Sequence, residues 1–401
     1  MVVLRSAPKS WQGPMMRFQW LLIAALLGWG PTPTNAQDCP PTEQSNWPVA
    51  GSQLSLQYAE GFKVEYFDAF KLITVLAPPG VDHPFQYILL PCGAADPDGY
   101  DGIQRIAIPP RRTAALSTTQ LPHFELLNEV GSLAGISAIG PVYSTQLNQR
   151  YEEGSLAEIG HGPGLDLELV LDLEIDLLMA TAAPQSPYQD HPLLKEAGIG
   201  TVANAEYTEA TLLGRAEWIK FTAAFFDKEQ QAAAYFDTVV SHYHAYAALT
   251  QDLPASQRPT VFGGALWRDT WYISGGQSYP AQLVRDAGGH YLWADDDTRG
   301  SLPLDFEAVY QRAHSGDFWL TMHNDWKRLA DVAAADSRYA DFAAFAHSQV
   351  YNANARLNPQ GGNDYWERGV VEPHILLADF IKMLHPELLP QHHLKYYQRL
   401  D

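Results

Sequence analysis

The hydrophobic pattern of the first part of the chain predicts β structure. Residues 54–67 contain two runs in which apolar and polar side chains alternate, on either side of Ala59-Glu60-Gly61, as in a β-hairpin. The apolar segments 70–78 and 86–91 continue this pattern. We therefore expect a strand-rich region at the start of the protein.

From residue 113 on, strand-like and helix-like segments alternate. Short apolar runs at 113–117, 133–137 and 175–180 have the pattern of buried strands, and the segments 123–131 and 166–173 have that of helices. Strands and helices that alternate along a chain form parallel sheets with crossover helices. The sequence therefore predicts an α/β lobe in this region.

Between residues 211 and 250 the chain has the spacing of helices only. Asp227 and Gln230 stand three residues apart, as in a capping box, and apolar residues then recur at every third or fourth position. These residues are Ala232, Phe236, Val239, Tyr243 and Tyr246. The spacing predicts one long amphipathic helix, with a further helical segment at 211–226 before it.

The alternation resumes at residue 260 and closes with a helix at 374–384. The predicted fold class is α/β, with two α/β lobes bridged by a long rigid helix and an extra N-terminal strand-rich extension. The expected parts are a signal peptide (1–36), the extension (37–104), an N-terminal lobe (105–208), linking helices (209–254), and a C-terminal lobe with its closing helix (255–401).

The first residues have the composition of a secretory signal peptide. Arg5, Lys9 and Arg17 precede the apolar run 18–30, and Ala36 suits a small-residue cleavage site. The run is shorter than the ~20 residues that a membrane-spanning helix needs. We therefore expect cleavage after Ala36 and a periplasmic location.

The charge of the mature chain excludes some classes of binding partner. The sequence has 26 Lys and Arg residues against 46 Asp and Glu residues, for a net charge of −20. Cleavage of the signal removes basic residues and no acidic residue, so the mature chain is still more acidic. Such a surface repels nucleic acid and anionic lipid, and we expect no nucleic-acid partner.

Cys39 and Cys92 are the two cysteines of the chain. An exported compartment allows them to pair, and we predict a disulfide that ties the mature N-terminus to the end of the strand at 86–92. Cys39 as a lipid-anchored first residue is the alternative. The residues 36-AQD-38 lack the small side chain directly before Cys39 that lipoprotein processing requires, so we expect no lipid anchor.

The sequence contains no strong catalytic, nucleotide-binding or metal-binding motif. The glycine-rich stretches 160–164 and 275–278 lack the lysine and the spacing of phosphate-binding loops. His242 and His244 stand two residues apart on a predicted helix and so face different ways, which does not suit a metal pair. We therefore expect no catalytic residue, no protein-only metal site and no cofactor.

His161 and His323 differ from the other histidines because each follows a turn or a strand-like segment. Open α/β sheets place ligands at such positions. A role in a cleft and ordinary packing remain open for both residues.

Aromatic residues gather at the predicted strand ends and loops of the C-terminal lobe. They are accompanied there by Arg268, Arg299 and Arg368. This mixture suits a ligand with broad apolar faces and a few anionic groups. The aromatic residues are Trp267, Trp271, Tyr272, Trp293, Trp326, Tyr365 and Trp366.

The chain contains four segments in a particular order, with the long helix between the second and the third: 112–137, 165–180, 271–289 and 304–320. In this order the chain resembles the iron-complex and vitamin B12 class of ABC-transporter periplasmic substrate-binding proteins. The resemblance covers roughly residues 105–390. It implies two α/β lobes joined by one long helix, with a ligand clamped between them and no enzymatic activity. The strand-rich region at 54–104 departs from the compact members of this family.

The resemblance also implies partners and site residues. Glu168 and Glu307 match the family's two surface glutamates, each of which engages an arginine on the membrane permease; the helix dipole alone also favours acids at both positions. The implied partners are this permease and the ATPase subunits that work with it. We expect a monomer. By context in the family and by the aromatic cluster, the expected ligand-binding residues are Tyr143, His161, Trp267, Trp271, Tyr272, Arg299, His323, Tyr365 and Trp366.

The implied ligand is a metal complex. The arginines in the loops favour an anionic iron chelate of the siderophore type, while the tryptophans suit cobalamin or haem equally well. A chelatase-like enzyme that uses His161 or His323 is a rival interpretation, and the signal peptide argues against it. A bare divalent metal as ligand is less compatible with an aromatic cleft.

Overall fold

The computed structural model describes residues 50–183 and 191–401. The predicted signal peptide and Cys39 lie outside the described residues, so the cleavage site and the disulfide remain predictions. Cys92 was expected at the end of the strand 86–92, and it directly follows the observed strand, which ends at Pro91. No helix in the described ranges is long and apolar enough to cross a membrane.

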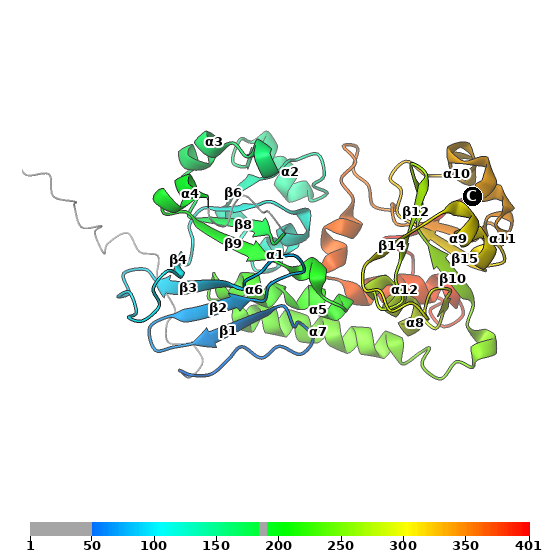
Figure 1. Ribbon diagram of the computed structural model, residues 1–401, viewed down its shortest axis with the longest axis horizontal. Coiled ribbons are helices and arrows are strands. Elements are labelled where there is room, and N and C mark those ends of the chain that lie inside the picture. The colour runs from blue at the N-terminus through cyan, green and yellow to red at the C-terminus, as the bar shows by residue number, and fades with distance from the viewer. Residues whose placement is uncertain (1–49, 184–190) are drawn as a thin grey trace, which may run out of the picture. The chain divides into compact units, whose positions relative to one another are not determined.

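The N-terminal extension is a four-stranded sheet in the order β1-β2-β3-β4 (Figure 1). Its strands are β1 (Phe62–Tyr66), β2 (Lys71–Val75), β3 (Phe85–Pro91) and β4 (Gln104–Ile108). The first three strands are antiparallel, and β4 pairs parallel to β3. The strand-rich prediction is confirmed, although the sheet continues to Ile108, past the predicted boundary at residue 104.

The predicted hairpin at 54–67 forms only in part. Gln53 pairs with Glu65 through a single antiparallel bridge, but residues 55–59 leave the sheet and bind the linking helices. The fully buried Glu217 carboxylate accepts hydrogen bonds from the backbone N–H groups of Tyr58 and Ala59, both at 2.8 Å. Buried carboxylates that accept several N–H groups are strong anchors, so this loop is fixed to the helices rather than to a strand.

The N-terminal lobe contains a five-stranded parallel sheet in the order β7-β6-β5-β8-β9. Its strands are β5 (Thr113–Ala115), β6 (Leu133–Ile136), β7 (Ala157–Glu158), β8 (Leu177–Thr181) and β9 (Gly200–Asn204). The helices that alternate with them are α1 (Leu121–Leu126), α2 (Thr145–Glu152), α3 (Leu167–Asp172) and α4 (Pro192–Glu196). The predicted α/β alternation is confirmed.

The extension covers the edge of this sheet at β9. The side-chain amide of Gln104 donates a hydrogen bond to the Ile199 carbonyl and accepts one from the Thr201 N–H, both at 3.2 Å. The Tyr87 hydroxyl accepts a hydrogen bond from the Ala203 N–H at 2.9 Å. An open edge strand invites pairing with other chains, and here side chains of the extension occupy backbone groups of that edge.

Three helices follow, namely α5 (Leu212–Glu217), α6 (Ile219–Ala224) and α7 (Glu229–Ala247). The predicted long helix is confirmed in α7, which buries Ala232, Phe236, Val239 and Tyr243. The predicted capping box is wrong. Asp227 has a positive φ of 55°, and its carboxylate pairs with the buried Lys71 ammonium at 2.6 Å instead of capping the helix.

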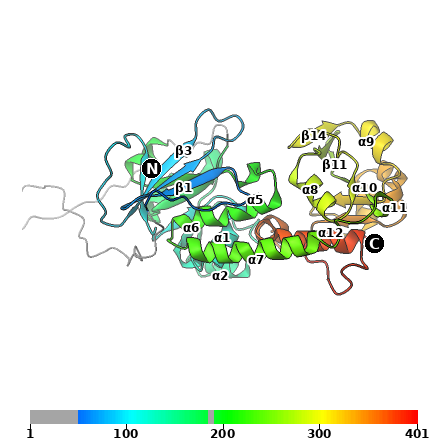
Figure 2. The ribbon, with the colours of Figure 1, turned by 90° about the horizontal axis from the view of Figure 1, so that it is seen from below.

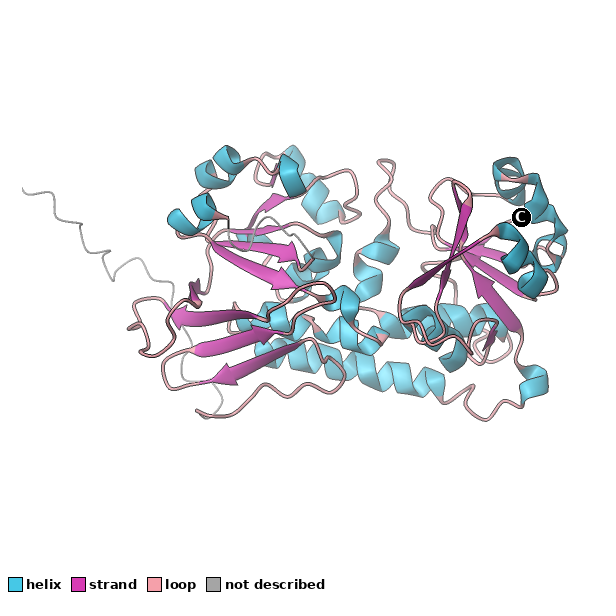
Figure 3. Cartoon of the chain, in the orientation of Figure 1, coloured by secondary structure: helices cyan, strands magenta, loops and turns pink. Residues whose placement is uncertain are grey.

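The C-terminal lobe contains a five-stranded sheet in the order β13-β10-β15-β16-β17. Strands β10 (Thr260–Gly263), β13 (His290–Tyr291), β15 (Phe318–Thr321) and β16 (Val350–Asn352) are parallel, and β17 (Gln398–Arg399) pairs antiparallel at one edge. Its helices are α8 (Tyr279–Asp286), α9 (Phe306–Ala313), α10 (Leu329–Ala335), α11 (Ala343–Ala346) and α12 (Pro373–Leu384). Helices flank the strands of this lobe (Figure 3), and α12 runs beside α7 (Figure 2).

A second, antiparallel sheet of three strands packs in the C-terminal lobe, and the sequence did not predict it. It consists of β11 (Ala265–Trp267), β12 (Thr270–Ser274) and β14 (Ser301–Leu304), in that order. The aromatic residues of the segment 267–278 were expected at strand ends and in loops. The segment begins instead at the tip of a hairpin and continues as strand β12.

Candidate ligand-binding site

The two lobes meet where the segment 356–368 of the C-terminal lobe contacts the loop before α2. The Asn358 side chain donates a hydrogen bond to the Val142 carbonyl at 2.6 Å. The Glu367 carboxylate accepts hydrogen bonds from the backbone N–H groups of Tyr143 at 2.7 Å and Ser144 at 2.9 Å. We call this contact the lobe junction.

Glu367 is a buried acid of the lobe junction. Burial raises the pKa of its carboxyl group from 4.5 to about 7. The hydrogen bonds from Tyr143 and Ser144 oppose this rise, while the negative charges of Asp364 and Glu125 add to it. The carboxyl group that joins the lobes therefore changes its charge near neutral pH.

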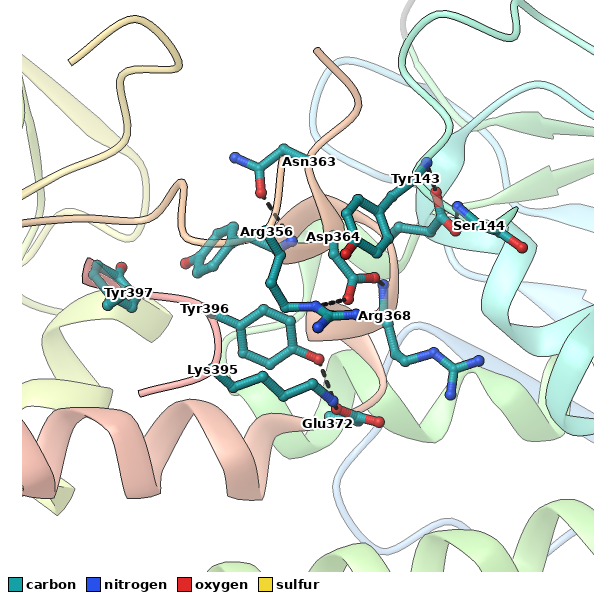
Figure 4. A network of polar contacts seen from close by, with 12 residues as sticks. Tyr143, Ser144, Arg356, Asn363, Asp364, Arg368, Glu372, Lys395, Tyr396 and Tyr397 are labelled. Carbon is teal, nitrogen blue, oxygen red and sulfur yellow. Dashed lines mark hydrogen bonds and ion pairs between the residues drawn. The ribbon is translucent and has the colours of Figure 1, made fainter. Parts of the chain in front are cut away.

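Two arginines accompany Glu367 at the lobe junction. The Arg356 guanidinium stacks over the Tyr143 ring at 4.8 Å, and its Nε donates to the Asp364 carboxylate at 2.5 Å (Figure 4). Arg368 forms an ion pair with Glu125 of α1. The stacking of Arg356 on Tyr143 and the ion pair of Arg368 with Glu125 both connect the C-terminal lobe to the N-terminal lobe.

A further group of polar contacts surrounds Glu372, the residue before α12. Glu372 accepts a hydrogen bond from the Tyr396 hydroxyl at 2.6 Å and forms an ion pair with Lys395 (Figure 4). Burial raises the pKa of Tyr396 well above its usual value, so this phenol stays protonated. These contacts hold the C-terminal segment against the start of α12.

Among the predicted ligand residues, the structure brings Tyr143, Tyr365 and Trp366 to the lobe junction. Trp366 precedes Glu367 directly, and its carbonyl accepts a hydrogen bond from the Thr118 hydroxyl of the N-terminal lobe at 3.4 Å. The Tyr365 and Trp366 rings make an edge-to-face contact at 4.8 Å. Trp366 keeps 37% of its surface exposed, so it is available to a ligand.

Tyr365, a predicted ligand-binding residue, is not exposed. It is buried and lines a small cavity of about 50 Å³ together with Tyr279, Tyr397 and Met322. Ligand pockets usually measure about 300–1,000 Å³, and this cavity has room for about one or two water molecules. Tyr365 therefore supports the wall behind the junction.

The prediction for Trp271 is wrong. Its side chain has no exposed surface, and its Nε1 donates a hydrogen bond to the Gly263 carbonyl at 3.0 Å. Successive side chains of a strand point to opposite faces, and in β12 Trp271 takes the inner face. Tyr272, the next residue, is 42% exposed.

Trp267 is the most exposed of the predicted aromatic residues. It ends β11 and keeps 61% of its surface exposed. The guanidinium of Arg268, which has a positive φ of 56° in the hairpin turn, stacks over the Trp267 ring at 4.5 Å. The hairpin thus presents one indole face already paired with a cation.

His323 follows β15 and is exposed. Its ring stacks on the buried Trp326 at a centroid distance of 4.6 Å and an angle of 11°. The buried Asn352 accepts a hydrogen bond from the His323 N–H at 2.8 Å and donates one to the Trp326 carbonyl at 2.8 Å. These contacts fix both the backbone and the ring plane of His323.

His161 and Arg299 lie apart from these contacts. Both side chains are exposed, His161 before α3 and Arg299 before β14. Within the described ranges, no hydrogen bond or ion pair joins either side chain to the lobe junction. Their roles as ligand residues remain predictions.

The two predicted docking glutamates occupy equivalent local positions. Glu168 is exposed in the first turn of α3, behind the N-cap Asp166, and Glu307 is exposed in the first turn of α9, behind the N-cap Asp305. They differ in one respect, because Glu307 lies 3.9 Å from the Arg338 guanidinium. No such cation accompanies Glu168 in the part of the chain that the structure describes.

Sequence reasoning missed Arg356, Glu367 and Glu125. The segment 363-NDYWERG-369 was considered for its aromatic residues, while its acids and arginine drew no attention as an inter-lobe contact. Isolated charged residues carry no local pattern that reveals a partner far along the chain. The described residues contain no group of three or more His, Cys, Asp or Glu side chains that could hold a metal ion.

Comparisons with known proteins bear on this arrangement. A family described as periplasmic binding protein matches residues 114–357. An uncharacterised lipoprotein of Methanocaldococcus jannaschii is 26% identical over 301 residues, which cover 72% of this chain and 68% of that protein.

Two solved structures show the likeness of fold. A periplasmic haem-binding protein of Roseiflexus superposes with a TM-score of 0.51 at 16% identity, over 69% of this chain and 99% of that chain. A protein of an ABC-type Fe³⁺-hydroxamate transport system of Saccharomonospora viridis superposes with a TM-score of 0.50 at 16% identity, over 69% and 94% of the two chains. At these identities the likeness concerns the fold.

Proposed function

The chain belongs to the periplasmic binding protein family of ABC transporters, and we propose that it captures an iron complex of the siderophore type between its lobes and delivers it to a membrane permease. It acts as a carrier, not as an enzyme. Cobalamin or haem is the alternative ligand of the same carrier. One structural neighbour is named for binding haem and another for Fe³⁺-hydroxamate transport, so both ligand classes occur on this fold.

The exposed aromatic side chains of the C-terminal lobe carry this proposal. Trp267 and Tyr272 on the β11–β12 hairpin and Trp366 at the lobe junction all keep large exposed areas. Each aromatic side chain buries about 150–250 Å² when it is covered, so a ligand with a broad face gains much from them. Arg268 stands beside the Trp267 ring and provides positive charge for an anionic chelate.

Delivery requires recognition of the loaded carrier by its transporter. We assign this role to Glu168 and Glu307, which present carboxylates on α3 and α9. Basic loops of a permease are the complementary surface for these acids, and the acidic charge of the whole chain raises the rate of encounter with them. The protein is a monomer in this scheme, and the permease works with its ATPase subunits.

Fluorescence titration tests the ligand. Purified protein is titrated with ferric siderophores, haem and cobalamin while tryptophan emission is followed, with Trp267→Ala as the variant expected to lose affinity. Tyr151→Ala is the matched control, because Tyr151 is an exposed aromatic residue on α2, outside the proposed site. Quenching by none of these ligands, together with retained zinc or manganese in elemental analysis, would contradict the proposal.

The mature N-terminus is tested separately. We propose export through the signal peptide and cleavage after Ala36 without a lipid anchor, although the relative from Methanocaldococcus jannaschii is named a lipoprotein. The intact mass of protein isolated from the periplasm distinguishes the two cases. A mass increased by acyl chains, with a chain that begins at Cys39, would show that an anchor is present.

A further inference from the structure

The loop after β15 is held in one conformation by two buried asparagines. The Asn352 side chain donates to the His323 carbonyl at 2.6 Å and to the Trp326 carbonyl at 2.8 Å. Asn354, the second asparagine, donates to the same Trp326 carbonyl at 2.8 Å. Asn352 ends β16, Asn354 follows two residues later, and both are almost fully buried. A side chain on this loop is therefore preorganised rather than mobile.

The hydrogen bond at Nδ1 fixes the tautomer of His323. The backbone N–H of Asp325 lies 3.3 Å from Nδ1 of the imidazole. A backbone N–H can only donate, so Nδ1 must be the accepting nitrogen and carries no proton in the neutral ring. The proton of the neutral imidazole is consequently on Nε2.

The Nε2–H group faces no protein acceptor. Among the described residues, none makes a hydrogen bond with Nε2 of His323, and the side chain is exposed. Stacking on Trp326 holds the ring plane and so fixes the direction of the Nε2–H bond. The structure thus offers one oriented donor to whatever occupies the space beside it.

This donor lies next to the lobe junction. Asn324, the next residue, donates to the Gly361 carbonyl at 3.4 Å and accepts from the Asn363 side chain at 3.3 Å. Gly361 and Asn363 belong to the same segment as Asn358, which contacts the Val142 carbonyl of the other lobe. His323 therefore stands on the loop that borders the segment bridging both lobes.

From this geometry, and resting on the proposed function, we infer that His323 recognises an oxygen atom of the ligand by donating a hydrogen bond from Nε2–H. It does not coordinate the metal of the ligand. Coordination through Nε2 would move the ring proton to Nδ1, where it would face the Asp325 N–H and replace an attractive contact by a repulsive one.

The inference narrows the class of ligand. A metal whose coordination shell is completed by the ligand's own carboxylate, catecholate or hydroxamate oxygens needs no protein ligand, and its outer oxygens accept hydrogen bonds. A haem iron with an open axial position would instead draw on a coordinating side chain of the protein, such as a histidine through its nitrogen. His323 as a fixed donor favours the chelate whose oxygens already surround the metal.

The tautomer is measured first, in the ligand-free protein. Two-bond ¹H–¹⁵N correlation spectra of ¹⁵N-histidine-labelled protein at pH 8 separate the two neutral tautomers, and the signal of His323 is the one missing from the His323→Gln variant. The expected result is protonated Nε2 and unprotonated Nδ1. Protonated Nδ1 would overturn the inference, whatever the ligand is.

Binding variants then test the donor. Gln places an amide N–H near the position of Nε2, whereas Asn reaches only the position of Nδ1. We expect His323→Gln to bind ferric siderophore within about threefold of the unmodified protein, and both His323→Ala and His323→Asn to bind roughly 10- to 100-fold more weakly. Equal affinity of all three variants would overturn the inference.

Haem distinguishes donation from coordination. If haem binds, its absorption spectrum should be the same in the unmodified protein and in His323→Ala, because Nε2 does not ligate the iron. A low-spin spectrum that is lost in His323→Ala would overturn the inference while supporting the carrier function. Failure of every siderophore, haem and cobalamin to bind would refute the proposed function itself, and with it recognition by His323.

Discussion

Replacing Glu367 by Gln should make the stability of the protein less sensitive to pH. The Glu367 carboxyl group is almost fully buried at the lobe junction, where it accepts hydrogen bonds from Tyr143 and Ser144. Burial raises its pKa to about 7 in the folded protein, against an ordinary value of 4.5. Gln has a similar shape and can still accept a hydrogen bond, but it carries no charge at any pH.

The sign and size of the effect follow from the two pKa values. Below pH 4.5 the group is protonated in both the folded and the unfolded chain, so it adds no pH dependence. As the pH rises from 4.5 to 7, the unfolded chain ionises while the folded chain stays largely protonated, and the folded state loses stability. At about 1.4 kcal/mol per pH unit, the full loss is about 3 kcal/mol.

Urea unfolding of both proteins at a series of pH values from 4 to 8 measures this effect. The free energy of unfolding of Glu367→Gln, relative to that of the unmodified protein, should rise by about 3 kcal/mol across this range, with most of the rise between pH 4.5 and 7. Glu196→Gln, at an exposed carboxylate that ends α4, is the control and should show no such rise. A constant difference between Glu367→Gln and the unmodified protein would refute the assigned pKa.

Three further predictions address the core, the sheet edge and the docking surface. Trp271→Ala should lower the free energy of unfolding by about 3–5 kcal/mol because it leaves a cavity in the core. Trp267→Ala should change the free energy of unfolding by less than about 0.5 kcal/mol but weaken ligand binding. Urea unfolding and ligand titration of both variants check this. Tyr87→Phe removes the acceptor of a buried N–H on β9 and should cost about 1–3 kcal/mol in urea unfolding, with ligand affinity unchanged; a neutral effect would contradict the edge contact. Glu168→Arg combined with Glu307→Arg should abolish uptake of ligand by whole cells without changing affinity, and normal uptake would refute the docking assignment.

Regular patterns allowed much of the fold to be predicted. The three- and four-residue spacing of apolar residues in α7 identified a helix whose buried face matches the expected side chains. The apolar runs of β6 and β8 are buried, as parallel strands covered on both faces must be. Such patterns arise from the periodicity of the backbone itself, so they can be recognised without knowledge of the partner segments.

The candidate site was predictable only in outline. Aromatic residues at strand ends and in loops pointed to the C-terminal lobe, yet of the neighbours Trp271 and Tyr272 the first is buried and the second is exposed. Their difference depends on which face of β12 meets the core. The antiparallel sheet that sets this face forms between β12 and β14, which are distant in sequence, so the segment 267–278 alone did not contain the answer.

The sequence by itself determined the α/β class, the position of the long helix and the family resemblance, because these depend on local periodicity and on the order of segments. The tertiary structure alone decided that Glu367 joins the lobes and that Gln104 and Tyr87 cover the edge of β9. It also decided that Nδ1 of His323 faces an N–H group. The physical reason is that burial and hydrogen-bond direction are set only when distant segments meet. A single polar residue is not part of a periodic pattern, so the sequence does not indicate its partner.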